Sequence, residues 1–374
     1  MKIGFDAKRA FYNSRGLGCY SRDVIRLLSD YYSENQYFLY TPKTHDAISF
    51  PHNESICQVR APQGLHSWGP FSSLWRTKSI CSDIQQDQLD IYHGLSHELP
   101  YGIEKTGTHT VVTMHDLIFL KNPELFPLFD RYSFRKKYTH GASVADRIIA
   151  ISEETKSDLI NYLGEKEERI DVVYQGYSTV FRNAVTDEQK RIIKTKYNLP
   201  DHFMLIICAI ERRKNHELIL KAMRNPQVEL PLVIAGNPSQ YKETLLSMIH
   251  EYQLDQKVFF IGHVETSDLP PLYQLADIFV YPSLFEGFGR PILESLVMGT
   301  PVITSKGSCF QETGGKAARY VSCDDDEELA NTIIQITSDE SLRKTMIEEG
   351  YRHAANFSDE KIAAKLMETY KKIV

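Results

Sequence analysis

The stretch at 278–301 constrains the fold of this chain more than any other, because a strand signal, a turn signal and a helix signal follow one another in it. The run Ile278–Tyr281 is continuously apolar, which is typical of a parallel strand that is buried on both faces. The two glycines that follow allow a sharp turn. Pro291 suits the first turn of a helix and Gly299 suits its C-terminal end. The stretch therefore predicts a strand–loop–helix unit of an open α/β sheet.

Two carboxylates stand in this unit where open α/β sheets bind ligands. Glu286 lies on the loop beyond the strand, and Glu294 lies about one turn into the helix. The amides of Gly287, Phe288 and Gly289 come just before the helix N-terminus, whose unpaired N–H groups attract anions. This corner therefore predicts a site for a ligand that carries both hydroxyls and phosphate. The alternative is structural, since tight turns and acidic first helical turns are common.

The whole chain fits two α/β domains of ordinary size. Its 374 residues exceed what one hydrophobic core usually organises. Strand and helix patterns alternate in both halves, and polar residues replace the apolar runs between 178 and 190. We expect domains at 1–182 and 183–357, followed by a helix at 358–374. Strands of the second half are expected near 203–210, 231–235, 257–261, 277–282, 301–304 and 318–322.

Composition narrows the classes of function. A net charge of −6 argues against a general nucleic-acid-binding protein, which would carry an excess of basic residues. No apolar run approaches the length of a transmembrane helix, and the N-terminus lacks the apolar core of a signal peptide. The six cysteines are scattered without Cys-x-x-Cys spacing, which indicates reduced thiols. We therefore expect a cytoplasmic protein.

Two clusters of the first half follow predicted strands. Gly16 and Gly18 lie between the first strand and a helix expected at 21–32, in a loop whose amides could approach a phosphate. A flexible loop without a ligand is the alternative. His115 and Asp116 follow a β-branched strand, on the same rim as these glycines. An isolated histidine at such a place is most often structural.

Two further candidates of the second half also follow strands. Arg213 and Lys214 follow the first strand, where clustered cations match a diphosphate: arginine binds it in bidentate fashion and lysine acts as a point charge. The alternative is a charged surface loop. Val264 lies on the loop after the strand expected at 257–261.

The acidic run at 324–328 resembles a metal site in composition. It directly precedes an apolar helical pattern, however, and acidic residues are favoured where helices begin. A hard cation also needs ligands that converge in three dimensions, which a run along one helix end does not supply. We therefore expect a helix start and no metal site.

Two regions leave structural and functional interpretations open. The segment at 126–147 is basic, which indicates either a solvated helix face or a contact with anionic lipid or a polyprenyl-diphosphate acceptor. The long loop at 41–80 contains aromatic residues that either pack it onto the domain, the reading we favour, or line an acceptor site. The cations of the first are Arg131, Arg135, Lys136, Lys137 and Arg147, and the large apolar residues of the second are Trp68, Phe71, Leu74 and Trp75.

Several of these motifs resemble one enzyme family. Glu286 and Glu294, with Glu-Gly-Phe-Gly leading and Gly-Thr-Pro closing, resemble the signature of the family 4 retaining glycosyltransferases. Arg213-Lys214-Asn215 matches the family's Arg-Lys-Asn. Cys208 replaces the glycine usually found six residues before that lysine, so the family's backbone conformation and diphosphate contacts do not carry over directly at this point. The run ending in His115-Asp116 resembles a subset that includes bacterial mannosyltransferases.

The resemblance implies the GT-B fold, in which two Rossmann-like doubly wound domains face each other across a cleft and the last helix packs back on the first domain. It implies transfer of a hexose with retention, from a nucleotide sugar such as GDP-mannose or a UDP-sugar to a hydroxyl of a glycan or polyprenyl-linked acceptor. Mannose is the first choice, and no cofactor is expected. Glu286 and His115 would be catalytic, the latter by hydrogen-bonding a sugar hydroxyl or taking its proton. Substrate-binding residues would be Gly16, Gly18, Asp116, Arg213, Lys214, Val264, Gly287, Phe288, Gly289 and Glu294.

Three alternatives remain on the same fold. A nucleotide-sugar epimerase would use the same donor, and a glycan phosphorylase would need a phosphate or pyridoxal site that the sequence does not reveal. A non-catalytic nucleotide-sugar-binding protein would keep the pocket but lose Glu286 or His115. Both residues are present here, which weighs against that alternative.

Overall fold

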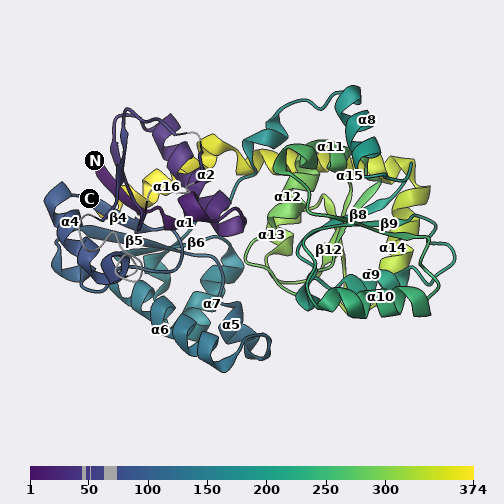
Figure 1. Ribbon diagram of the computed structural model, residues 1–374, viewed down its shortest axis with the longest axis horizontal. Coiled ribbons are helices and arrows are strands. Elements are labelled where there is room, and N and C mark those ends of the chain that lie inside the picture. Colours follow the sequence, from purple (N-terminus) through teal and green to yellow (C-terminus); the bar gives the residue numbers. More distant parts are fainter. Residues whose placement is uncertain (44–47, 51, 63–73) are drawn as a thin grey trace. The chain divides into compact units, whose positions relative to one another are not determined.

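The computed structural model describes residues 1–374 except 44–47, 51 and 63–73 (Figure 1). The chain forms two compact units, one of Met1–Gly176 with Ser358–Val374 and one of Tyr177–Phe357. The boundary expected from the sequence lies between 182 and 183. The structure places 177–182 with the second unit, because Phe181 is buried in that unit's core.

The first unit is built on a seven-stranded parallel sheet with the order β3-β2-β1-β4-β5-β6-β7. Its central strands are almost completely buried, as their apolar composition predicts. The strands are β1 (Lys2–Asp6), β2 (Gln36–Tyr40), β3 (Cys57–Arg60), β4 (Ile91–Gly94), β5 (His109–Met114), β6 (Arg147–Ala150) and β7 (Ile170–Val172).

Helices connect and cover these strands, as parallel neighbours require. They are α1 (Lys8–Tyr12), α2 (Gly16–Tyr31), α4 (Ile80–Asp87), α5 (Ile118–Lys121), α6 (Leu128–Val144), α7 (Glu153–Leu163) and α16 (Asp359–Lys371). Short π or 3-10 turns cover Trp75–Ser79, Ile103–Lys105, Pro123–Leu125 and Glu167–Arg169.

The start of α2 differs from the helix expected at 21–32. Gly16 and Gly18 belong to its first turn and not to a loop before it, because the carbonyl of Arg15 accepts hydrogen bonds from the amides of Gly18 and Cys19 (2.8 and 3.0 Å). Glycine is required at 18, since a Cβ there would lie 1.6 Å from the carbonyl oxygen of Asn13.

The segment at 41–80 contains more structure than its composition predicts. It holds β3 and the π turn that leads into α4. Trp75 is buried beside Tyr40 and packs the segment onto the unit, whereas Leu74 is exposed. Trp68 and Phe71 lie outside the described residues.

The second unit is a six-stranded parallel sheet with the order β10-β9-β8-β11-β12-β13, and all six expected strands are present. The strands are β8 (Met204–Ile207), β9 (Leu232–Ala235), β10 (Val258–Gly262), β11 (Ile278–Tyr281), β12 (Val302–Ser305) and β13 (Ala318–Val321). The helices are α8 (Asp187–Lys196), α9 (His216–Ala222), α10 (Tyr241–Glu251), α11 (Leu269–Leu275), α12 (Arg290–Val297), α13 (Phe310–Gly314), α14 (Asp326–Ser338) and α15 (Glu340–Ala354). Short 3-10 turns cover Thr179–Arg182, Arg212–Lys214, Thr266–Asp268 and Ala355–Phe357.

The last helix, α16, returns to the first unit (Figure 1). It packs against α2, where Arg26 forms an ion pair with Asp359 (2.8 Å). Tyr370 is fully buried, and its hydroxyl bonds to Nδ1 of His93 on β4 (2.7 Å). None of the helices that the structure describes is long and apolar enough to cross a bilayer.

Candidate active site

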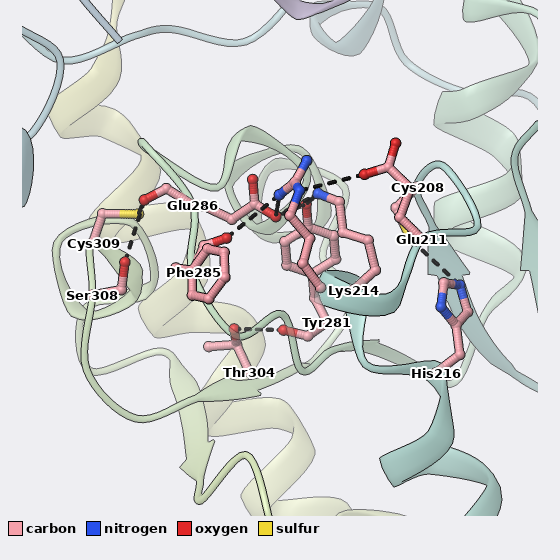
Figure 2. Close-up of polar contacts among 11 residues, drawn as sticks. Cys208, Glu211, Lys214, His216, Tyr281, Phe285, Glu286, Thr304, Ser308 and Cys309 are labelled. Carbon is pink, nitrogen blue, oxygen red and sulfur yellow. Dashed lines mark hydrogen bonds and ion pairs between the residues drawn. The ribbon is translucent and has the colours of Figure 1, made fainter. Parts of the chain in front are cut away.

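The loop after β11 is held in place by bonds from two other segments. The amide of Leu284 donates to the carbonyl of Arg213 (2.9 Å), which ties the loop to the 3-10 turn after β8. The carbonyl of Glu286 accepts from Ser308 Oγ and Cys309 Sγ (3.2 and 3.3 Å; Figure 2). The backbone of Glu286 is therefore positioned from both sides, and its side chain turns toward the cations.

The carboxylate of Glu286 is the centre of a buried charge cluster (Figure 2). Its Oε1 forms ion pairs with Arg213 Nη1 (2.9 Å) and with Nζ of Lys214, and it accepts a hydrogen bond from the hydroxyl of Tyr281 (3.1 Å). Burial raises the pKa of Glu286, but the two positive charges outweigh burial and lower the pKa to about 2. Glu286 is therefore ionised at neutral pH.

Lys214 is buried, which is unusual for lysine and requires a partner. Its ammonium donates to the hydroxyl of Tyr281 (2.6 Å) and lies 4.9 Å from the centre of the same ring. The sequence did not single out Tyr281. Its place as the last residue of a buried strand, directly before the glycine-rich loop, was the only available signal.

Cys208, which stands where the resemblance implies a glycine, packs against α9 and against the backbone of Gly236. Its thiol contacts Nε2 of His216 on α9 (3.6 Å; Figure 2). Close backbone approach is provided by Gly236, where a Cβ would lie 1.7 Å from the carbonyl oxygen of Cys208. Burial raises the pKa of the Cys208 thiol to about 12, so it is uncharged at neutral pH.

The helix α12 begins as its sequence predicts. Gly289 occupies the N-cap position with φ of 83°, a left-handed conformation that glycine adopts without strain. Glu294 is buried on the following turn, where its carboxylate accepts from Tyr273 (3.2 Å) and pairs with Arg290 (3.2 Å). The ring of Phe288 packs against Phe357 and is buried, so only its backbone could meet a ligand.

Val264 is brought to the end of β10, and its side chain is also buried in the core of the second unit. A ligand at this loop would therefore meet main-chain groups.

His115 in the first unit is buried and neutral. Nε2 donates to the carbonyl of Leu95 (2.9 Å), which assigns the proton to that nitrogen. Nδ1 consequently carries the lone pair and accepts from Gln175 over 3.5 Å. Burial lowers the pKa of His115 to about 4. The ring is therefore suited to accepting a hydrogen bond from a hydroxyl, and is a weak base.

Asp116 and the first turn of α2 complete the predicted sites of the first unit. Asp116 Oδ1 accepts from the amide of Ile118 (3.3 Å), which fixes the start of α5. Gly16 faces open space at its Cβ position, so a ligand could approach its backbone. The side chain of Tyr20 from the same helix meets the ring of His115 edge-on, with centroids 4.6 Å apart.

The acidic run at 324–328 begins a helix, as expected. Asp325 is the N-cap of α14 and accepts from the amide of Glu328 (2.8 Å). No group of three or more His, Cys, Asp or Glu side chains is placed to hold a metal ion within the part of the chain that the structure describes.

The basic segment forms α6 and the start of β6. Lys137 pairs with Glu98 and Arg147 with Asp171, so these two cations are part of the unit's own ion pairs. Leu128, Phe129 and Tyr132 of α6 are 78, 80 and 70% exposed. A groove of about 470 Å³ is lined by Tyr101, Tyr132, Arg135, Lys136, Thr139 and His140.

Two family models match almost the whole chain. Residues 21–181 match the model described as "Glycosyltransferase Family 4", and residues 187–353 match "Glycosyl transferases group 1". The two matched regions fall in the first and the second unit respectively, apart from a few residues at their boundary.

Curated relatives are named as glycosyltransferases, and solved structures share the fold of this chain. The chain is 29% identical to O-antigen chain mannosyltransferase B of Escherichia coli, over 75% of this chain and 74% of the relative. It is 30% identical to the serotype-specific mannosyltransferase WbdA of E. coli over 71% of this chain, which spans only 34% of that longer protein. A glycosyltransferase from Rickettsia africae has the same fold (TM-score 0.77, 19% identity, 100% of this chain and 98% of the other). Anabaena Alr3699/HepE in complex with UDP and glucose also shares it (TM-score 0.72, 18% identity, both chains fully covered).

Proposed function

Because the chain belongs to the family 4 glycosyltransferases of the GT-B fold, we propose that it transfers a hexose from a nucleotide sugar to a hydroxyl of a glycan or lipid-linked acceptor, with retention. The observation that carries this proposal is the cluster of Glu286, Arg213 and Lys214 at the carboxyl end of β11. It places two cations and one carboxylate beside a helix N-terminus, which suits a ligand that carries a diphosphate and a sugar.

In this proposal, the diphosphate of the donor binds Arg213 and Lys214 in place of Glu286. Cleavage of the sugar–phosphate bond leaves a nucleoside diphosphate with new negative charge, which Arg213 and Lys214 stabilise. Glu286, no longer shared with both cations, then orients the sugar through its hydroxyls, while the 287–289 amides assist. Glu294, held by Tyr273 and Arg290, positions the ribose hydroxyls.

We propose front-side attack, in which the leaving phosphate takes the proton of the acceptor hydroxyl. The neutral His115 supports this choice, because its pKa of about 4 makes it a poor proton acceptor at neutral pH. His115 Nδ1 would instead hold a substrate hydroxyl by accepting its hydrogen bond. The alternative is a double displacement with Glu286 as the nucleophile, for which its ionised state is also suited.

We propose mannose as the transferred sugar, from GDP-mannose. The support is the similarity to two relatives named as mannosyltransferases, reinforced by the motif around His115. The neighbour bound to UDP and glucose makes UDP-glucose the competing donor. No bound cofactor is part of this proposal.

The test is incubation of the protein with a panel of nucleotide sugars, with acceptor candidates added, and analysis of all products. Release of nucleoside diphosphate together with a glycosylated acceptor is the expected result. An epimerised nucleotide sugar without acceptor modification would overturn the proposal in favour of an epimerase. Phosphate-dependent release of a sugar phosphate from a glycan would favour a phosphorylase.

We also propose that α6 contacts an anionic membrane, where a lipid-linked acceptor would lie. Its exposed Leu128 and Phe129 can enter the headgroup region, and Arg135 and Lys136 on the same helix can meet anionic lipids. Peripheral binding of this kind needs no membrane-spanning helix.

Sedimentation with vesicles tests this contact. Vesicles of phosphatidylglycerol and phosphatidylcholine should bind the protein and vesicles of phosphatidylcholine alone should not. The double variant Leu128→Ser, Phe129→Ser should lose most binding, whereas Tyr351→Ser, which removes another exposed aromatic residue in the second unit, should retain it. Equal binding by both variants would exclude α6 as the contact.

A further inference from the structure

Arg9 of α1 carries a guanidinium group that forms neither a hydrogen bond nor an ion pair with the residues that the structure describes. Its Nε is buried and has no hydrogen-bond partner, and no ion pair joins its side chain to the described residues. Buried guanidinium nitrogens are normally hydrogen-bonded, because they lose their bonds to water on burial. The described part of the first unit therefore supplies no group that compensates for the burial of Arg9 Nε.

The neighbouring cations do not share this feature. Arg76 binds both carboxylate oxygens of Asp6 and one oxygen of Glu98, and Lys137 binds the other oxygen of Glu98. The acidic groups next to Arg9 are thus already used by other cations. The pKa of the neighbouring Lys8 is lowered by burial and then by the positive charges of Arg76 and Arg9, which outweigh the opposite effects of Asp6 and Glu98.

The position of Arg9 places it with His115. β1, β4 and β5 are adjacent in the sheet, and their carboxyl ends are followed by Arg9, His97 and His115 respectively. The charge of Arg9 contributes, after burial, to the lowered pKa of both histidines. His97 stacks on Tyr138 with ring centroids 4.2 Å apart, which closes one side of the cluster.

We propose that Arg9 is a phosphate-binding residue that receives a phosphate group of a substrate at this edge of the first sheet. A planar guanidinium binds a phosphate through two parallel hydrogen bonds, and a phosphate would satisfy the buried Nε. His115 Nδ1, which can only accept, would bind a hydroxyl of the same substrate. The proposal rests on the proposed transferase function in naming a substrate, but the binding of phosphate can be tested without it.

The phosphate could belong to a phosphorylated or diphosphate-linked acceptor, or to the donor. Both sources would present the same chemical group to Arg9, and two titrations distinguish them. In the first arm, methyl phosphate is titrated into the full-length protein saturated with GDP, which occupies the donor cations. In the second arm, GDP is titrated alone. His97 and His115 report on both titrations through the ring-carbon shifts of protein labelled with ¹³C-histidine.

Arg9→Gln should weaken methyl phosphate binding at least tenfold, and Arg9→Lys should retain part of it. Arg15→Gln, which removes an exposed cation of the same unit, should change it less than twofold. Unchanged GDP affinity in Arg9→Gln assigns the phosphate to the acceptor, whereas a tenfold loss assigns it to the donor. Wild-type binding of both ligands by Arg9→Gln, with unchanged thermal unfolding, would overturn the proposal. Arg9-dependent phosphate binding in a protein that transfers no sugar would overturn the proposed function and leave the phosphate site standing.

Discussion

The two units both place their candidate residues after the carboxyl ends of parallel strands, but the charge of these residues differs. In the second unit, Glu286 at the end of β11 is ionised between Arg213 and Lys214. In the first unit, His115 and His97 follow β5 and β4 and are uncharged. Burial acts against charge in both places, but the charges that act on Glu286 are opposite to its own, whereas those that act on His97 and His115 are positive as well.

This difference suits two kinds of ligand group, a charged diphosphate in the second unit and a neutral hydroxyl in the first. A cluster with a net positive charge can exchange its own carboxylate for a diphosphate with little new desolvation. A buried neutral imidazole presents a lone pair to a hydroxyl without attracting anions. Arg9 is the exception in the first unit, because its positive charge acts on these two neutral histidines and could attract an anion.

Glu286→Gln is the most severe test of the charged cluster in the second unit. The amide keeps the shape of the side chain but removes the charge that orients and stabilises the sugar in the transition state, so we expect turnover to fall about 100- to 1,000-fold. Nucleoside diphosphate affinity should be unchanged or higher, because the two cations lose their internal competitor. Initial rates at saturating donor and calorimetry with GDP measure the two effects. Intact turnover with abolished binding would reverse the assigned roles.

Lys214→Met removes one cation and keeps the buried aliphatic chain. The loss of a charge-assisted hydrogen bond should weaken nucleoside diphosphate binding by about 1.5–3 kcal/mol, or roughly ten- to a hundredfold. The matched control is Lys306→Met, whose exposed ammonium pairs with Glu328 and not with Glu286. Calorimetry that gives the same affinity for wild type and Lys214→Met would remove Lys214 from the donor site.

Mild acid should destabilise the first unit, which contains the buried neutral histidines, before it destabilises the second unit. The pKa values of His93 and His115 are lowered by burial to about 3 and about 4, and that of His97 is lowered as well. Between pH 6.5 and these values the unfolded chain binds protons that the folded unit does not, so stability falls as pH falls. His93 and His115 should each cost roughly 1–2 kcal/mol at pH 5, and His97 should act in the same direction.

Urea unfolding at pH 7 and pH 5 measures this effect. Both tryptophans, Trp68 and Trp75, lie in the sequence of the first unit, so their fluorescence reports on it. The stability that ionised Glu286 gives to the second unit is fully present above pH 4.5 and is lost between pH 4.5 and about pH 2, because its folded-state pKa is lowered to about 2. In the second unit, burial lowers the pKa of one histidine, His216, to about 4. We therefore expect the second unit to lose less stability than the first between pH 7 and pH 5. A fluorescence midpoint that is the same at both pH values would contradict the neutral state of the cluster.

The sequence predicted the second unit better than the first. Continuous apolar strands and the Pro291–Gly299 helix signals are local, and all six strands were found where expected. In the first unit, β2 and β3 were missed and α2 begins at Gly16, because its first turn is stabilised by contact with the segment at 9–13 and not by its own composition. Tyr281 and Arg9 were missed because their importance depends on which partners lie near them in space.

Asp325→Asn gives the smallest expected effect and shows whether acidic charge alone marks a site. Like Glu286, Asp325 lies between a strand and the helix that follows it. Its carboxylate, however, only caps α14. Asparagine caps helices as well as aspartate, so stability should change by less than about 0.5 kcal/mol, whereas Asp325→Ala should lose about 1 kcal/mol. Turnover should be unchanged in both variants, measured as initial rates on folded protein alongside urea unfolding. A large loss of turnover in Asp325→Asn, reversed by added Mn²⁺ or Mg²⁺, would contradict the helix-cap assignment and return the acidic run to consideration as a metal site.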